Sequence, residues 1–214
     1  MMSVGGRNGA FQEYLVVDAR EASKIPDGMS FVTAAPLACA GMTSWRAINQ
    51  CHLEKGQWIG IVGSGGGLGH LAIQFAKKAR GLKVIAVDAR DDGIALSKEC
   101  GADVVVDARE GKEKVVEEVM KATGRGCDAT IELSGHPTAA EMGAAITRQH
   151  GRLVQVAIVS ISPFTSSAVL LTILVDRESL NTYSGVLVQR HSCQRLIHGF
   201  AKGDRRNAAC CCRA

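Results

Sequence analysis

Between residues 56 and 158, short runs of apolar residues alternate with longer stretches in which apolar residues recur at helical spacing. The run from Trp58 to Val62 ends at a cluster of glycines. After it, apolar residues stand at positions 68, 71, 72, 75, 76 and 79, a spacing that places them on one face of a helix. Gly81 follows, where a glycine commonly ends a helix. This part of the chain therefore predicts a buried strand, a tight turn and an amphipathic helix.

The same alternation continues along the segment. Further strands are predicted at residues 83–87, 104–106, 129–133 and 153–157. Helices are predicted between them, near residues 91–100, 113–123 and 137–151. Strands that alternate with helices through short loops indicate a parallel sheet with right-handed crossovers. The predicted fold class is therefore α/β, with a doubly wound parallel-sheet Rossmann domain over residues 46–159.

The overall composition is typical of a folded domain, but the net charge is distributed unevenly along the chain. It has 214 residues, of which 46% are hydrophobic and 21% charged, enough to bury a core. The formal net charge of +4 comes from residues 160–214, where basic residues outnumber acidic ones. A basic tail can bind nucleic acid, but this one has no interleaved aromatic residues and no recognition motif. We therefore expect a divergent basic tail and no nucleic-acid partner, although nucleic-acid binding stays open as an alternative.

The cysteines and the ends of the chain bear on its compartment. There are eight cysteines without a CxxC pair, and the first residues contain no apolar run typical of a signal peptide. The apolar runs at 168–171 and 173–175 are too short to span a bilayer. A reducing, cytoplasmic location without a membrane partner is the expectation.

The strongest local signal is the glycine-rich turn between the first predicted strand and helix. Backbone without side chains lets a pyrophosphate approach, and the N–H groups and dipole of the following helix favour its negative charge. An ordinary tight turn is the alternative. The candidate cofactor-binding residues of the turn are Gly63, Gly65, Gly66, Gly67, Leu68 and Gly69.

An acid follows at the position that such a turn requires. Asp88 ends the second predicted strand, where a carboxylate accepts hydrogen bonds from the adenosine ribose hydroxyls. It would also repel a 2′-phosphate, which favours NAD over NADP, whereas Arg90 two residues later weakens that preference. A helix-capping or solvated acid is the alternative interpretation of Asp88.

Several segments together resemble the zinc-containing medium-chain alcohol dehydrogenases of the microbial tetrameric type. The similarity runs over residues 9–158. It lies in GAFQEYLVVDAR, AAPLACAGMTSWRAI, GQWIGIVGSGGGLGHLAIQFAK, and VIAVD followed by GIALSKECGAD. The resemblance implies NAD-dependent oxidation of primary or secondary alcohols to aldehydes or ketones, a catalytic zinc, and a homo-oligomer whose partners are small-molecule alcohols or aldehydes.

The resemblance also implies roles for individual residues. Cys39 matches the second cysteine ligand of the catalytic zinc, although its apolar surroundings alone indicate an inert buried thiol. Ser134 matches a position near the adenosine. Val156 and Ile158 match positions whose backbone meets the nicotinamide, with ordinary strand core as the alternative. Where the family often has a lysine after the ribose acid, Gly93 stands here.

Other parts of the family pattern are missing from this sequence. The first zinc cysteine, the zinc histidine and the four-cysteine structural zinc lobe have no match. We therefore expect a chain truncated at both ends. Residues 1–45 would be a remnant of the GroES-like catalytic domain with its connecting helix, and residues 160–214 the divergent basic tail.

Because one thiolate cannot build a tetrahedral zinc site, no catalytic residue is assigned and we expect no turnover by the chain alone. Two alternatives remain: a non-catalytic NAD(H)-binding module, and a zinc-free enzyme of the quinone-reductase kind.

Overall fold

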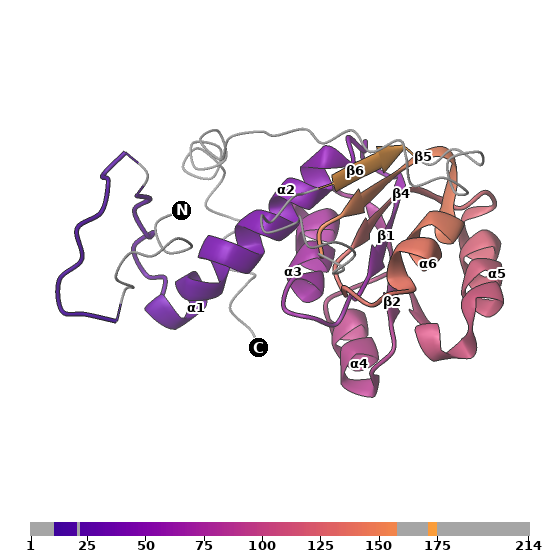
Figure 1. Cartoon of the computed structure of the whole chain (residues 1–214), viewed down its shortest axis with the longest axis horizontal. Helices are drawn as coiled ribbons and strands as arrows, with labels where there is room; N and C mark the ends of the chain where they lie inside the picture. The colour runs from indigo at the N-terminus through magenta and orange to yellow at the C-terminus, as the bar shows by residue number, and fades with distance from the viewer. Residues whose placement is uncertain (1–10, 21, 158–170, 175–214) are drawn as a thin grey trace.

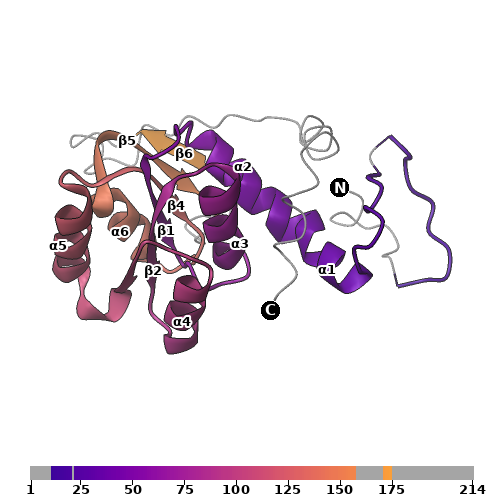
Figure 2. The ribbon, with the colours of Figure 1, turned by 180° about the vertical axis from the view of Figure 1, so that it is seen from behind.

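The computed structural model of the chain describes residues 11–20, 22–157 and 171–174. Helices cover both faces of one sheet (Figures 1 and 2), whose strand order is β3-β2-β1-β4-β5-β6. Strands β1 to β5 are parallel, and β6 runs antiparallel to β5. The predicted doubly wound Rossmann sheet is confirmed. The strands are β1 (Trp58–Val62), β2 (Lys83–Asp88), β3 (Val104–Asp107), β4 (Cys127–Glu132), β5 (Thr147–Gln155) and β6 (Leu171–Leu174).

Two hydrophobic clusters place the helices on opposite faces of the sheet. One cluster joins β1 to α2 and α3, and the other joins β2 to α5 and α6. None of the helices among the described residues is long and apolar enough to cross a membrane. The α-helices are α1 (Phe31–Pro36), α2 (Met42–Gln50), α3 (Gly69–Gln74), α4 (Asp91–Glu99), α5 (Lys112–Thr123) and α6 (Ala139–Ile146). Shorter elements are the π-helices η1 (Leu37–Gly41) and η2 (Phe75–Ala79) and the 3₁₀ helix η3 (Ala108–Glu110).

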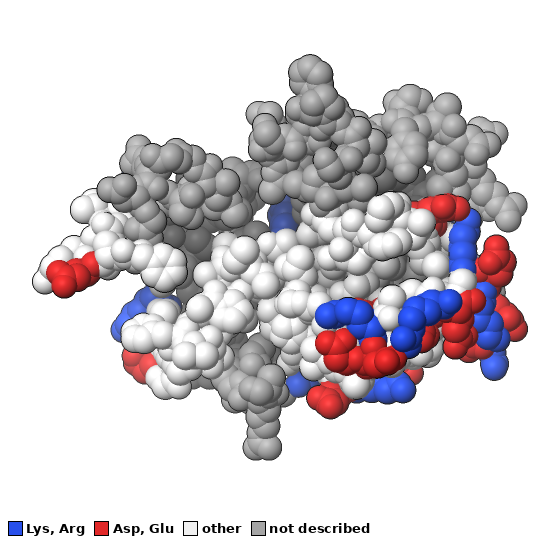
Figure 3. All heavy atoms as spheres, turned by 60° about the horizontal axis from the view of Figure 1, so that its bottom comes forward, with Lys and Arg blue, Asp and Glu red and all other residues white. Residues whose placement is uncertain are grey.

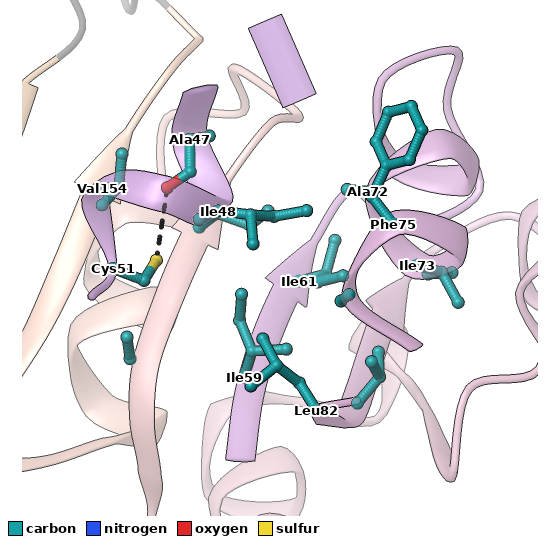
Figure 4. Packing of buried hydrophobic residues seen from close by; sticks show 14 of the residues in the cluster. Ala47, Ile48, Cys51, Ile59, Ile61, Ala72, Ile73, Phe75, Leu82 and Val154 are labelled. Carbon is teal, nitrogen blue, oxygen red and sulfur yellow. Dashed lines mark hydrogen bonds between the residues drawn. The ribbon is translucent and has the colours of Figure 1, made fainter. Parts of the chain in front are cut away.

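The alternation of side chains along β1 explains the two clusters. Ile59 and Ile61 are both fully buried against α2 and α3 (Figure 4), whereas Val62 packs on the opposite face. Burying one such side chain stabilises a fold by about 1.5–3 kcal/mol. At Gly60, a Cβ would lie 2.8 Å from Thr130 Oγ1, so the two central strands β1 and β4 need a glycine there.

One expectation about the chain after residue 137 was wrong. The last predicted helix ends at Ile146 rather than near Gly151, and β5 begins at Thr147. The Thr147 hydroxyl lies 2.6 Å from the Gly143 carbonyl and 2.7 Å from Thr130 Oγ1, which draws the chain into the sheet. Beyond β5, the strand β6 pairs with residues 152–155 of β5.

The N-terminal segment differs from the sheet domain. Residues 11–20 and 22–29 form no helix or strand, and the side chains of Phe11, Tyr14 and Val16 are exposed. From Met42 onward, α2 contributes Ala47 and Ile48 to the main core. The proposed division of the chain at residues 45 and 159 stays a prediction.

Candidate dinucleotide-binding site

The glycine-rich turn connects β1 to α3 at the carboxyl edge of the sheet, as predicted. Gly63 adopts a positive φ of 80°, and its N–H donates to the Val87 carbonyl of β2 at 2.9 Å. A Cβ at this position would lie 2.8 Å from both Cβ and the backbone nitrogen of Ser134. Both the backbone conformation and the space therefore require glycine at the first position of the turn.

The remaining glycines divide into a packed set and an open one. A Cβ at Gly65 would lie 2.0 Å from Gly93 Cα, and one at Gly69 would lie 2.3 Å from the Gly63 carbonyl oxygen. By contrast, a Cβ at Gly67 would meet nothing within 4 Å, and one at Gly66 would meet only the Gly63 carbonyl oxygen at 3.4 Å. The turn is therefore close-packed on its protein side and open on the other.

The open side carries backbone donors. Among the described residues, the N–H groups of Gly67 and Leu68 have no hydrogen-bond acceptor. The carbonyl of Leu68 is held from beneath by the buried Ser44 hydroxyl of α2, which donates to it at 2.8 Å. Free N–H groups ahead of a helix are the donors that anions bind in proteins.

Asp88 lies at the end of β2 beside this turn, and only 6% of it is exposed. Its Oδ2 accepts the Gly65 N–H at 2.8 Å, and its Oδ1 accepts the N–H groups of Ala89 and Arg90 at 2.9 and 3.1 Å. A carboxylate offers about four lone-pair positions, so one remains for a further donor. Asp88 thus fastens the glycine turn to β2. Its contact with a ribose stays a prediction.

Two residues beside Asp88 complete this corner. A Cβ at Gly93 would lie 2.6 Å from Asp88 Oδ1, so the first turn of α4 packs against the acid only because residue 93 has no side chain. The Arg90 guanidinium donates to the Gly65 carbonyl at 3.1 Å and lies 3.5 Å from Asp88 Oδ1. Because the Arg90 side chain is 57% exposed, it supplies a positive charge at the rim of the site.

The turn after β4 borders the site on its other side. Glu132 is fully buried, and its Oε1 accepts the Ser134 N–H and hydroxyl, both at 2.6 Å, and the Gly135 N–H at 2.9 Å. Its other oxygen accepts the Gln155 amide of β5. Glu132 therefore fixes the Ser134 turn against Gly63. Sequence reasoning missed it, although an acid inside an apolar strand just before Ser-Gly was a usable signal.

Of the two residues predicted to contact the nicotinamide, Val156 lies within the described part of the chain and Ile158 does not. Val156 follows β5, packs partly buried on the main core, and donates its N–H to the Glu132 carbonyl at 3.0 Å. It therefore lies at the same carboxyl edge as Ser134. Ile158 lies outside the described residues.

The predicted zinc ligand is not part of a metal site among the described residues. Cys39 lies in the π-helix η1 and is exposed, so it is not the buried thiol that its apolar surroundings alone indicate. No group of three or more histidine, cysteine or acidic side chains within the described ranges could hold a metal ion. These residues do not fit the family's zinc.

The thiols of Cys51 and Cys127 are buried, which raises the pKa of each to about 12.

Charge at this edge of the molecule is mixed. Figure 3 turns the carboxyl edge toward the viewer and shows acidic and basic side chains side by side over one part of it, with uncharged residues over most of the rest. The exposed ion pairs after β2 and β3 include Arg90–Asp92 and Arg109 with Asp91 and Asp107. The basic groups there are therefore largely balanced by acids.

Together, the parallel sheet, the glycine turn and the acid after β2 define a Rossmann-type dinucleotide-binding domain. Residues 67–199 match the zinc-binding dehydrogenase family, and the chain belongs to this family. An alcohol dehydrogenase of Schizosaccharomyces pombe is 40% identical over 149 residues, which cover 70% of this chain and 42% of the relative. The chain thus spans less than half the length of that relative.

Two solved structures of mycobacterial proteins are similar to this chain. The mycobacterial protein Rv1454c in complex with NADPH is 25% identical, with a TM-score of 0.65, and the match covers 89% of this chain and 55% of that one. A mycobacterial quinone oxidoreductase is 26% identical, with a TM-score of 0.58, over 64% of this chain and 42% of that one.

Proposed function

We propose that this chain binds NAD(H) at the carboxyl edge of the sheet, with the pyrophosphate on the open side of the glycine turn. The observation that carries the proposal is that the N–H groups of Gly67 and Leu68 have no acceptor within the described part of the chain, on the side where a Cβ at residue 67 would meet nothing within 4 Å. The cofactor phosphates would accept from these donors, and bare backbone lets them come close.

Asp88 is the residue that would set the preference for NAD(H). Its one remaining lone-pair position suits a ribose hydroxyl donor, whereas a 2′-phosphate would bring negative charge against a buried carboxylate. Arg90 acts in the opposite direction, because its exposed guanidinium lies beside the same carboxylate. A related protein binds NADPH. The preference for NAD(H) over NADP(H) therefore depends on whether repulsion of a 2′-phosphate by Asp88 outweighs its attraction to Arg90.

The reaction that we propose for the enzyme to which this chain corresponds is hydride transfer between a small alcohol and its aldehyde or ketone. Its support is the relative from Schizosaccharomyces pombe. The nicotinamide would lie near Val156, which follows β5 at the carboxyl edge, and the adenosine side of the cofactor near Ser134, after β4. We expect no alcohol oxidation by this chain alone, since Cys39 is one zinc ligand where a catalytic site takes three from the protein.

A zinc-free reductase is the second candidate, because a quinone oxidoreductase of similar fold matches 64% of this chain. Such an enzyme needs the same cofactor turn and no metal. It differs in one measurable respect: purified protein would oxidise NADPH or NADH in the presence of a small quinone without added zinc. Turnover with the quinone would favour this second candidate, whereas cofactor binding without quinone reduction would favour the first.

The proposal is tested by calorimetric titration of the full chain with NADH and with NADPH. We expect saturable binding of NADH and weaker binding of NADPH. Asp88→Asn keeps the size of the side chain and removes its charge, so it should weaken NADH binding and narrow the gap between the two cofactors. Equal loss of both cofactors would show that Asp88 only supports the turn, and a folded wild type that binds neither would refute the proposal.

A further inference from the structure

A pocket of about 250 Å³ opens at the amino edge of the sheet, at the opposite end of the strands from the glycine turn. It lies where α2 ends, where β1 and β4 begin, and where β5 enters the sheet. A strand of five residues separates the two edges by about 15 Å. The pocket is therefore distinct from the proposed cofactor site. Its lining residues are Cys51, His52, Leu53, Gln57, Asp128, Arg148, His150 and Arg152.

Its lining is positive once existing ion pairs are counted. Asp128 is the acid among the lining residues, and its Oδ1 is paired with Arg148 at 2.9 Å and with Arg125 at 2.8 Å. Its Oδ2 accepts the Trp58 N–H at 3.0 Å. Burial alone would raise the pKa of Asp128, but the Trp58 N–H and the two guanidinium groups outweigh burial and lower it. The negative charge of Asp128 is thus balanced by Arg125 and Arg148 and does not neutralise Arg152.

The second arginine of the pocket has no acidic partner among the described residues. Arg152 donates from Nη1 to the Cys51 carbonyl at the end of α2, at 3.0 Å. A guanidinium has five N–H donors, so most of those on Arg152 remain for a ligand. The Cys51 thiol instead donates to the Ala47 carbonyl (Figure 4), and its raised pKa makes it a poor metal ligand.

The pocket rim is built from unusual backbone. His52 (φ 48°) and His150 (φ 59°) are the described non-glycine residues with positive φ, and both line this pocket. Between the pairs Cys127–Thr147 and Ala129–Arg152 the register of β4 and β5 shifts, so residues 148–151 bulge opposite Asp128. Left-handed histidines and bulges cost energy and concentrate beside functional sites.

We propose that this pocket binds the phosphate group of a small phosphorylated metabolite, through the guanidinium groups of Arg148 and Arg152 and the imidazoles of His52 and His150. A tetrahedral phosphate accepts hydrogen bonds from several directions, which suits donors that come from α2's end, the bulge and β5. The volume is smaller than pockets that hold drug-sized ligands, so a dinucleotide does not fit it.

The test uses the ¹⁵N-labelled full chain, titrated with inorganic phosphate and with glycerol 1-phosphate in a buffer free of other oxyanions. Amide resonances of His52, His150 and Gly151 report the pocket, and those of Gly65 to Gly67 report the glycine turn. We expect saturable shifts at the pocket amides with both probes. Arg152→Gln should weaken this binding about tenfold or more, because a charge-assisted hydrogen bond is lost.

A second variant separates binding from a structural role. His150→Gly removes the imidazole but relieves the left-handed backbone, so it should weaken phosphate binding while the thermal midpoint stays equal or rises. Lys112→Gln, which changes an exposed ion pair of α5 with Glu141, is the matched control and should leave phosphate binding unchanged.

Three results would overturn the proposal. The first is the absence of saturable shifts at the pocket amides. The second is shifts there that both Arg152→Gln and His150→Gly leave intact. The third is binding of acetate as tight as that of phosphate. Shifts confined to Gly65–Gly67 count as the first result, since they would place the anion in the cofactor site.

Discussion

The two edges of the sheet carry candidate sites of different construction. At the carboxyl edge, the site is made of backbone: glycines pack where no Cβ fits, and N–H groups face the open side. At the amino edge, the pocket is made of arginine and histidine side chains drawn from α2's end and from β5. A backbone site depends on the absence of side chains in one short segment, whereas a side-chain pocket depends on residues far apart in the sequence. Adding a side chain should therefore damage the site at the carboxyl edge, whereas removing a side chain should damage the pocket at the amino edge.

The largest expected effect comes from adding one carbon to the packed side of the glycine turn. In Gly65→Ala the new Cβ would lie 2.0 Å from Gly93 Cα, so the turn and α4 must move apart. We expect a loss of about 3 kcal/mol or more in the free energy of unfolding, together with loss of NADH binding. Urea denaturation and calorimetry measure both. A variant as stable as wild type would show that this packing is not needed.

The next effect concerns the buried acid beneath the Ser134 turn. Glu132→Ala leaves the N–H groups of Ser134 and Gly135 without their acceptor and removes one of the two acceptors of the Gln155 amide, whose other acceptor is the Ala157 carbonyl. Ser134 is exposed, so water replaces part of what its N–H loses, but removing the fully buried Glu132 side chain also leaves a cavity, and we expect a loss of about 2–3 kcal/mol. Glu132→Gln keeps an acceptor for the turn and should lose less. Equal losses in the two variants would contradict this explanation.

A smaller effect links the amino edge to pH. Asp128→Asn removes the charge that pairs with Arg125 and Arg148, and we expect a loss of about 1–2 kcal/mol at neutral pH. Because folding lowers the pKa of Asp128, its contribution is present above its ordinary value of 3.8 and is lost as the pH falls through the folded value. The stability gap between wild type and variant should therefore close only in acid. A gap that does not change with pH would show that the ion pairs contribute nothing.

The smallest expected effect is a gain in stability rather than a loss. His150→Gly replaces a left-handed histidine, and glycine adopts that backbone without steric cost. We expect stability to stay the same or rise by up to about 1 kcal/mol, measured by thermal unfolding. A clear loss of stability would mean that the imidazole, rather than the bulge, holds this corner together.

These contrasts also explain which parts could be predicted from sequence. The β1 strand, the glycine turn, the helix after it and Asp88 lie in consecutive residues whose pattern is local, and each was found. Glu132 and Ser44 were missed, because their roles depend on partners brought together by the sheet. The bulge at residues 148–151 was mistaken for helix, since the Thr147 contacts that end α6 reach across to β4.

Cys39 shows the other limit of prediction. Its zinc role was carried over from the family resemblance, and the described residues bring no second or third ligand to it. A ligand set is a property of several segments at once, and a matching motif in one segment does not supply the others.

The central claim is that the open side of the glycine turn receives the cofactor pyrophosphate, and Gly67 tests it most directly. A side chain there meets no protein atom, so both Gly67→Ala and Gly67→Asp should fold with nearly wild-type stability. In calorimetric titrations with NADH, we expect Gly67→Asp to weaken binding by at least about tenfold through repulsion of the phosphates, and Gly67→Ala to weaken it far less. Unchanged NADH affinity in a folded Gly67→Asp variant would place the cofactor elsewhere and contradict the claim.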